Sequence, residues 1–84
     1  MIQQDIDKVV ALYRENPYWK ELFESASGGA KEYLAATFVN SEIGSKDTQE
    51  YVKHAENGLT KEECKWLSEN LPNRQARSYF KAKL

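Results

Sequence analysis

Cysteine and histidine are almost missing from this chain, whose 84 residues include one of each, Cys64 and His54. A single cysteine cannot form an internal disulfide, and small secreted domains usually depend on disulfides, so we expect a reducing compartment and a cytoplasmic location. A structural zinc site takes about four cysteine or histidine ligands. The sequence therefore predicts no metal site, and no motif in it indicates a cofactor.

Long apolar runs are also absent. The longest nearly apolar stretch, residues 33–39, is far shorter than the roughly 18 residues that indicate a membrane span. The first residues do not combine a basic segment with an apolar one, so no secretory signal is expected. We therefore predict no association with a membrane.

Aromatic residues, in contrast, are well represented, with two tryptophans, five tyrosines and three phenylalanines spread along the chain. Each large aromatic side chain buries about 150 to 250 Å² in a folded core. The composition, 40% hydrophobic and 30% charged with a net charge of -1, is ordinary for a globular protein. The length allows one core, so residues 1–84 are predicted to be a single domain.

Apolar residues recur every three or four positions, which is the period of an amphipathic helix. This period predicts helices at residues 2–16, 17–26, 30–43, about 47–57, 60–71 and 73–84. The helix at 30–43 is apolar around most of its circumference and should be central. The predicted fold is all-α, a single compact domain of five or six short helices around one aromatic-rich core.

Several short motifs set the predicted helix ends. Ser27-Gly28-Gly29 should interrupt the chain between two helices, and the D-x-x-E spacing from Asp47 suggests a helix start. Gly58 suits a left-handed helix end, with Leu59 making the accompanying hydrophobic contact. Thr60 and Glu63 match a capping box, in which each side chain bonds the backbone N–H of the other residue.

Residues able to carry catalysis lack the necessary neighbours. Cys64 shares an apolar stripe with Leu67 and Leu71, which is typical of a core residue, and His54 fits a solvated helix position. A Cys64–His54 nucleophile pair remains conceivable but has no third orienting group. Gly28-Gly29 has neither the lysine nor the spacing of a phosphate-binding loop. We therefore predict a non-catalytic protein with no catalytic residues.

Positive charge gathers near the C-terminal end, where no acidic residue follows position 73. Arg74, Arg77 and Lys81 fall within about 60° of one another on a helical wheel, forming one basic stripe. The stripe could contact phosphate groups or an acidic protein, or it could complement the helix dipole and keep the last helix soluble. Residues 50–69 also match about half of a helix-turn-helix pattern, which leaves nucleic-acid binding as an alternative function.

Trp66 breaks the pattern of its own helix, because it lies about 160° from Cys64 on the wheel. An exposed tryptophan is a common interface anchor, and Lys65, Glu62 and Glu69 could form a polar rim around it. Alternatively, the last helix folds back after Pro72 and covers Trp66. The first hypothesis is a protein-protein interaction module, binding an unknown partner or a second copy of itself. The alternative is a small helix-turn-helix-like nucleic-acid-binding protein.

Overall fold

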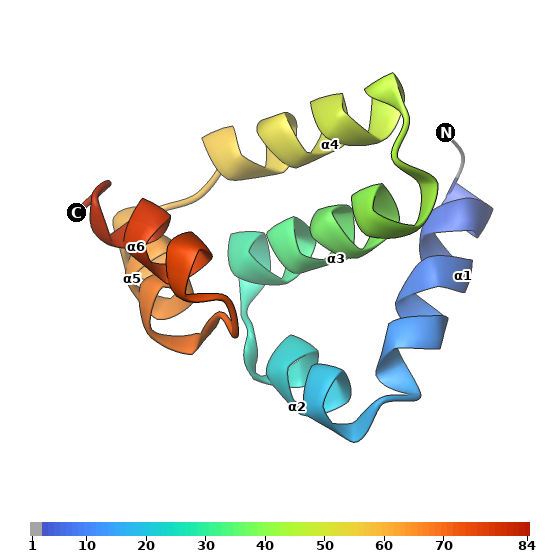
Figure 1. The fold of residues 1–84 in the computed structure, drawn as a ribbon, viewed down its shortest axis with the longest axis horizontal. Helices are drawn as coiled ribbons and strands as arrows, with labels where there is room; N and C mark the ends of the chain where they lie inside the picture. The colour runs from blue at the N-terminus through green and yellow to red at the C-terminus, as the bar shows by residue number, and fades with distance from the viewer. Residues whose placement is uncertain (1–2) are drawn as a thin grey trace.

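The computed structural model describes residues 3–84, which form six α-helices and no β-strand (Figure 1). The predicted all-α fold is therefore confirmed, and each predicted helix is present. Ile2, predicted to open the apolar stripe of the first helix, lies outside the described residues. The helices are α1 (Gln3–Arg14), α2 (Pro17–Ser25), α3 (Gly28–Ile43), α4 (Lys46–Asn57), α5 (Lys61–Asn70) and α6 (Arg74–Lys81).

Polar side chains begin several helices by accepting hydrogen bonds from backbone N–H groups that lack a partner inside the helix. The Asn16 side chain accepts from the N–H of Tyr18 at 3.0 Å, with Pro17 in the first turn of α2. The Asn73 side chain accepts from the N–H of Gln75 at 2.8 Å at the start of α6. These caps explain why the chain turns sharply at the Asn-Pro and Pro-Asn steps.

Two predicted helix ends are wrong in detail. Helix α4 is capped by Ser45, whose hydroxyl accepts from the N–H of Thr48 at 3.2 Å, so the helix begins before the expected start at Asp47. Gly58 has a φ of -87° and is not left-handed. The glycine that ends a helix in the left-handed conformation is instead Gly44, with a φ of 67°, after α3.

Helix α3 is central, as its wide apolar face predicts. It packs against α1, α2, α4 and α5 and runs through the middle of the molecule (Figure 1). Leu34 and Val39 of α3 are fully buried together with Leu67 of α5 and Phe80 of α6. Four of the other five helices are thus held together through α3, while α6 packs mainly on α5 and also contacts α3 and α4 through side chains.

Aromatic rings fill much of the remaining core. The Tyr13 ring stacks on Phe38 with centroids 4.3 Å apart, and Trp19 meets the same ring edge-on at 5.3 Å. Tyr33 packs edge-on against Phe80 at 5.1 Å. Offset and edge-to-face pairs of this kind each contribute about 0.5 to 1.5 kcal/mol beyond the area they bury.

Helix α6 buries fewer residues than predicted. Phe80 is completely buried and Ala76 is half-buried, but Tyr79 and Leu84 remain 48% and 54% exposed. Leu84 lies beyond the end of α6 at Lys81 and so leaves the buried face. The Tyr79 hydroxyl instead donates a hydrogen bond to Oε2 of Glu56 at 2.6 Å, which ties the surface of α6 to α4.

Glu63 joins the beginnings of two helices. Its Oε1 accepts from the N–H of Thr60 at 2.8 Å, completing the predicted capping box at the start of α5. Its Oε2 accepts from the N–H of Gly29 at 2.6 Å, at the start of α3. The N-cap residue of α3, Ser27, makes no side-chain cap bond. A carboxylate from α5 therefore supplies the negative charge that the N-terminus of α3 favours.

The two glycines of α3 make this close approach possible. Ser27, Gly28 and Gly29 were expected to separate two helices; α2 does end before them, but the two glycines belong to the first turn of α3. A Cβ atom at Gly29 would lie 2.7 Å from Oε1 of Glu63, and Gly28 has a φ of 49°. The backbone hydrogen bond from Thr60 is the largest cause that lowers the pKa of Glu63 below its ordinary value of 4.5, and the bond from Gly29 adds to it.

Candidate functional site

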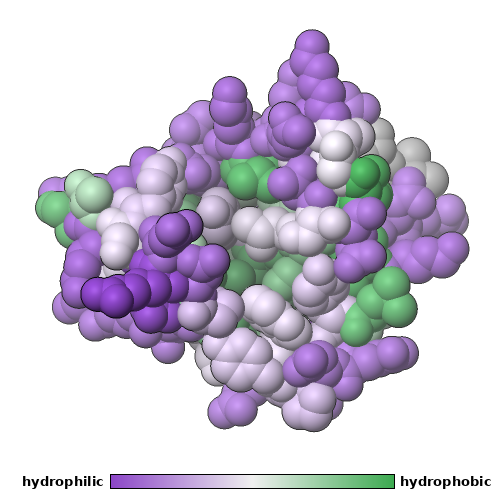
Figure 2. Space-filling view, viewed as in Figure 1, coloured by the Kyte–Doolittle hydropathy of each residue, from purple (hydrophilic) through white to green (hydrophobic). Residues whose placement is uncertain are grey.

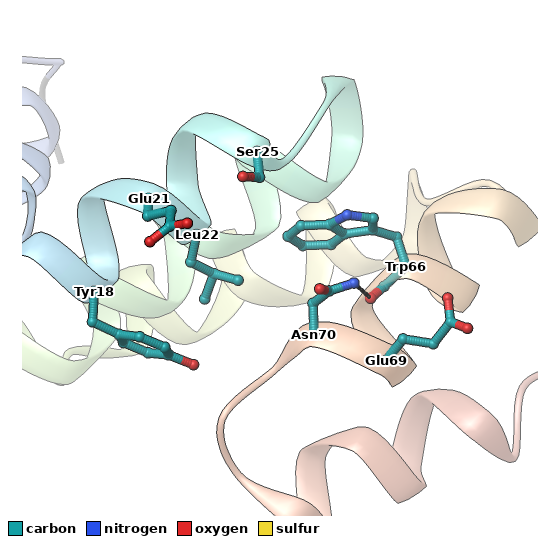
Figure 3. A pocket seen from close by; sticks show the side chains of 7 residues that line it. All are labelled: Tyr18, Glu21, Leu22, Ser25, Trp66, Glu69 and Asn70. Carbon is teal, nitrogen blue, oxygen red and sulfur yellow. Dashed lines mark hydrogen bonds between the residues drawn. The ribbon is translucent and has the colours of Figure 1, made fainter.

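A cleft of about 330 Å³ lies between α2 and α5. Figure 3 shows the indole of Trp66 reaching from α5 toward α2, and the Tyr18 ring reaching from α2 toward the same space. Leu22, which is buried, lies between them. The remaining lining residues are polar: Glu21, Ser25, Glu69 and Asn70.

Trp66 is neither fully exposed nor covered by the last helix. Its side chain is half-buried and packs against the core cluster. The cleft beside it is lined only by residues of α2 and α5, so α6 does not close this side. The wheel angle correctly placed Trp66 away from Cys64, and α2 is the neighbour that it meets there.

The structure places only part of the predicted rim around Trp66. Glu69 lines the cleft, whereas Glu62 and Lys65 are exposed on α5 without lining it. The opposite side is built by Tyr18 and Glu21 of α2, which the sequence reasoning missed. No signal in the sequence distinguishes Tyr18, because it lies only about 40° from Leu22 on the helical wheel, at the edge of the apolar stripe of its own helix.

The cleft is negatively charged. Glu21 and Glu69 are exposed, and neither carboxylate forms an ion pair or hydrogen bond within residues 3–84. In Figure 3 Glu21 lies on the α2 side of the cleft, and the Glu69 carboxylate, on the α5 side, points away from the indole of Trp66. No lysine or arginine is among the lining residues, so these two charges are not neutralised inside the cleft.

The predicted basic stripe on α6 is divided between two roles. Arg77 is half-buried, and its Nη1 donates to the backbone oxygens of Leu71 at 2.6 Å and Pro72 at 3.0 Å. It therefore holds the turn between α5 and α6, where the last carbonyl groups of α5 need donors. Arg74 and Lys81 are exposed on the surface.

The two helices of the possible helix-turn-helix segment pack mainly on other helices and not on each other. Helix α4 packs on α3, whereas α5 packs on α6 and α3. In Figure 1, α4 runs beside α3 and α5 turns away from it. The helices and the turn of the motif are present, but the packing that orients a recognition helix is missing from this pair.

Cys64 and His54 lie in different environments. Cys64 is 8% exposed and belongs to the same buried cluster as Leu67 and Leu71, as predicted for a core residue. His54 is exposed on α4. In the described part of the chain, residues 3–84, no group of three or more histidine, cysteine or acidic residues is arranged to hold a metal ion. No helix in the same range is long and apolar enough to cross a membrane.

A second depression, of about 350 Å³, is lined by side chains of α1, α2, α3, α6 and the α5–α6 turn, including Tyr33, Thr37 and Pro72. None of its lining residues is charged. Figure 2 shows apolar and weakly polar residues gathered at the middle of one face, over α3, with hydrophilic residues around them. The uncharged depression offers no electrostatic feature that would select a partner, in contrast to the cleft at Trp66.

Comparison of the chain with protein families, with curated proteins and with solved structures finds no match.

Proposed function

We propose that this protein is a non-catalytic protein-binding module, and that the cleft between α2 and α5 is its binding surface. The observation that carries the proposal is the half-buried Trp66 facing a cleft whose other wall holds Tyr18, a tyrosine left 51% exposed. Tryptophan and tyrosine are enriched among the residues that dominate binding energy at protein interfaces.

Buried Cys64 and the absence of a second cysteine support a reducing compartment such as the cytoplasm.

The size of the cleft indicates what it can hold. A volume of about 330 Å³ is at the lower end of ligand pockets and accommodates one or two side chains rather than a whole domain. The cleft therefore suits a short segment of a partner, with one anchoring side chain between the two aromatic residues. Contacts of this size are typical of weak, transient complexes.

Selection of peptides from a random 12-residue display library on the full chain tests this proposal. We expect enriched peptides to bind the folded protein and to lose about 30-fold in affinity when Tyr18 is changed to alanine, equivalent to ~2 kcal/mol for an interface anchor. Tyr18 is the better target than Trp66, because Trp66 also packs against the core and its loss could unfold the protein.

The matched control is Tyr79→Ala, which removes a tyrosine of similar exposure, 48%, from α6. Circular dichroism should show that both variants keep their helices. Peptides that bind Tyr18→Ala as well as the unchanged protein, or that fail only with Tyr79→Ala, would show that the binding surface lies elsewhere.

Nucleic-acid binding through Arg74, Arg77 and Lys81 is the alternative, and it has less support. Arg77 is already engaged with two backbone oxygens of the α5–α6 turn, and α4 and α5 do not pack as a helix-turn-helix pair. Retention on a nonspecific DNA duplex at low salt, lost steeply as salt rises, would favour this alternative.

A further inference from the structure

We infer that the cleft between α2 and α5 accepts a positively charged side chain, arginine or lysine, from a segment of another protein. This inference rests on the proposed function and names the chemistry of its partner. Three features carry it: the uncompensated charge of the cleft, the aromatic character of its walls, and the way other aromatic rings of this chain already attract cations.

The charge of the cleft favours a cation. Glu21 and Glu69 stand on opposite sides of it, both exposed and without an ion-pair partner in residues 3–84. By comparison, Glu24 of α2 is paired with Arg14 at 3.0 Å, and Glu56 of α4 with Lys83 at 3.3 Å. A cationic side chain in the cleft would be attracted by the charges of both carboxylates, and because these are exposed, salt should weaken the attraction.

The walls of the cleft favour the same kind of ligand. The faces of tryptophan and tyrosine rings attract cations, and tryptophan does so most strongly. An arginine guanidinium suits such a place especially well, since it can stack on a ring and form a two-pronged contact with a carboxylate. The aliphatic stem of arginine or lysine would cover Leu22, which lies between the two rings.

Other aromatic rings of the protein already hold cations from the chain itself. Lys31 Nζ lies 5.2 Å from the centre of the Phe23 ring, and Lys83 Nζ lies 4.9 Å from that of Tyr79. Within residues 3–84, no such contact involves Tyr18 or Trp66. The aromatic walls of the cleft are thus left for a cation from outside the chain.

The experiment uses peptides selected from the random 12-residue library on the full chain. We expect the enriched peptides to carry arginine or lysine more often than the unselected library. Their affinity should fall about tenfold in the double variant Glu21→Gln/Glu69→Gln and should weaken with rising salt. The control, Glu32→Gln/Glu50→Gln, changes the net charge equally at exposed positions on α3 and α4 that do not line the cleft.

The outcomes separate this inference from the proposed function. Peptides that need Tyr18 but lack cations, or that bind both double variants equally, would overturn the cationic ligand and leave the binding cleft in place. Finding no peptide that depends on Tyr18 would overturn both the cationic ligand and the proposed binding cleft. A dimer seen in sedimentation that disappears with Glu21→Gln/Glu69→Gln would overturn the separate partner, because a second copy would then supply the cation.

Discussion

Replacing Glu63 with alanine should destabilise the whole domain, although this glutamate is only half-buried and belongs to a surface helix. Its two carboxylate oxygens accept hydrogen bonds from the N–H groups of Thr60 and Gly29, at the starts of α5 and α3. The substitution removes the negative charge and the acceptors from both helix ends together. The damage should therefore exceed the loss of a single cap.

The expected magnitude follows from the two hydrogen bonds that the carboxylate accepts, since the N-cap bond from the backbone N–H of residue 63 to the Thr60 hydroxyl is kept. One such bond contributes about 1 kcal/mol, so the loss of two should lower the free energy of unfolding by about 2 kcal/mol. For a domain of this length that corresponds to a fall in melting temperature of roughly 8 to 16 °C. Glu63→Gln keeps one acceptor oxygen but loses the charge, and it should cost roughly half as much. Urea unfolding followed by circular dichroism measures both values.

The effect of Glu63 should depend on pH. Hydrogen bonds from the backbone lower the pKa of this carboxyl in the folded protein below 4.5, so the folded state favours the ionised form. The resulting stabilisation is fully present above pH 4.5 and is lost as the pH falls through the folded-state pKa. The difference in stability between the unchanged protein and Glu63→Gln should therefore be largest near neutral pH and should shrink below pH 4.5.

Glu62→Ala is the control, because Glu62 occupies the same first turn of α5 but is exposed and forms no hydrogen bond through its side chain in the described structure. It should change the free energy of unfolding by less than about 0.5 kcal/mol. Equal losses for Glu62→Ala and Glu63→Ala would refute the bridging role of Glu63. So would a difference between the unchanged protein and Glu63→Gln that stays constant down to about pH 3.

Three further predictions concern single residues. Gly29→Ala should lower the free energy of unfolding by about 1 kcal/mol, because the new Cβ would lie 2.7 Å from a Glu63 oxygen. This loss is expected although alanine usually favours a helix over glycine. Urea unfolding should show no such loss for Gly58→Ala, where the atom nearest to the new Cβ is at 3.7 Å. Burial and then the Glu56 charge raise the pKa of Tyr33 to about 12. Absorbance at 295 nm should therefore show a tyrosine that ionises late, and Tyr33→Phe should abolish this step. The neutral form of Tyr33 stabilises the folded state, and this stabilisation should be lost between pH 10 and 12. The buried thiol of Cys64 should react with a disulfide reagent at least about 100-fold more slowly in the folded protein than in urea, and comparable rates would contradict its core position.

The fold was largely predictable because local rules decide most of it. Apolar spacing identified all six helices, and the Thr60–Glu63 capping box was found from four consecutive residues. The errors occur where two positions in the chain fit the same local motif. Gly44 and Gly58 each follow a predicted helix, and the sequence alone does not distinguish Gly44, which is left-handed, from Gly58, which is not.

The candidate site was only half predictable, because periodicity gives a direction around one helix and not the identity of the neighbouring helix. Trp66 was correctly placed off the apolar stripe of α5, but nothing in its own segment points to Tyr18 and Glu21, more than forty positions away. The hydrogen bond from Gly29 to Glu63 could not be predicted for the same reason, since Gly29 lies 34 residues before Glu63 in the chain.

The order of the helices also bears on how the protein folds. Helices near one another along the chain pack together: α3 with α4, α5 with α6, and α1 with both α2 and α3. Such local contacts are typical of domains that fold in microseconds to milliseconds. We expect docking of the α5–α6 pair onto α3 to come late, because it must close the 34-residue separation between Gly29 and Glu63. Since α5 carries Trp66 and α2 carries Tyr18, that last docking step also assembles the cleft, and a partly folded chain would have no binding surface to offer.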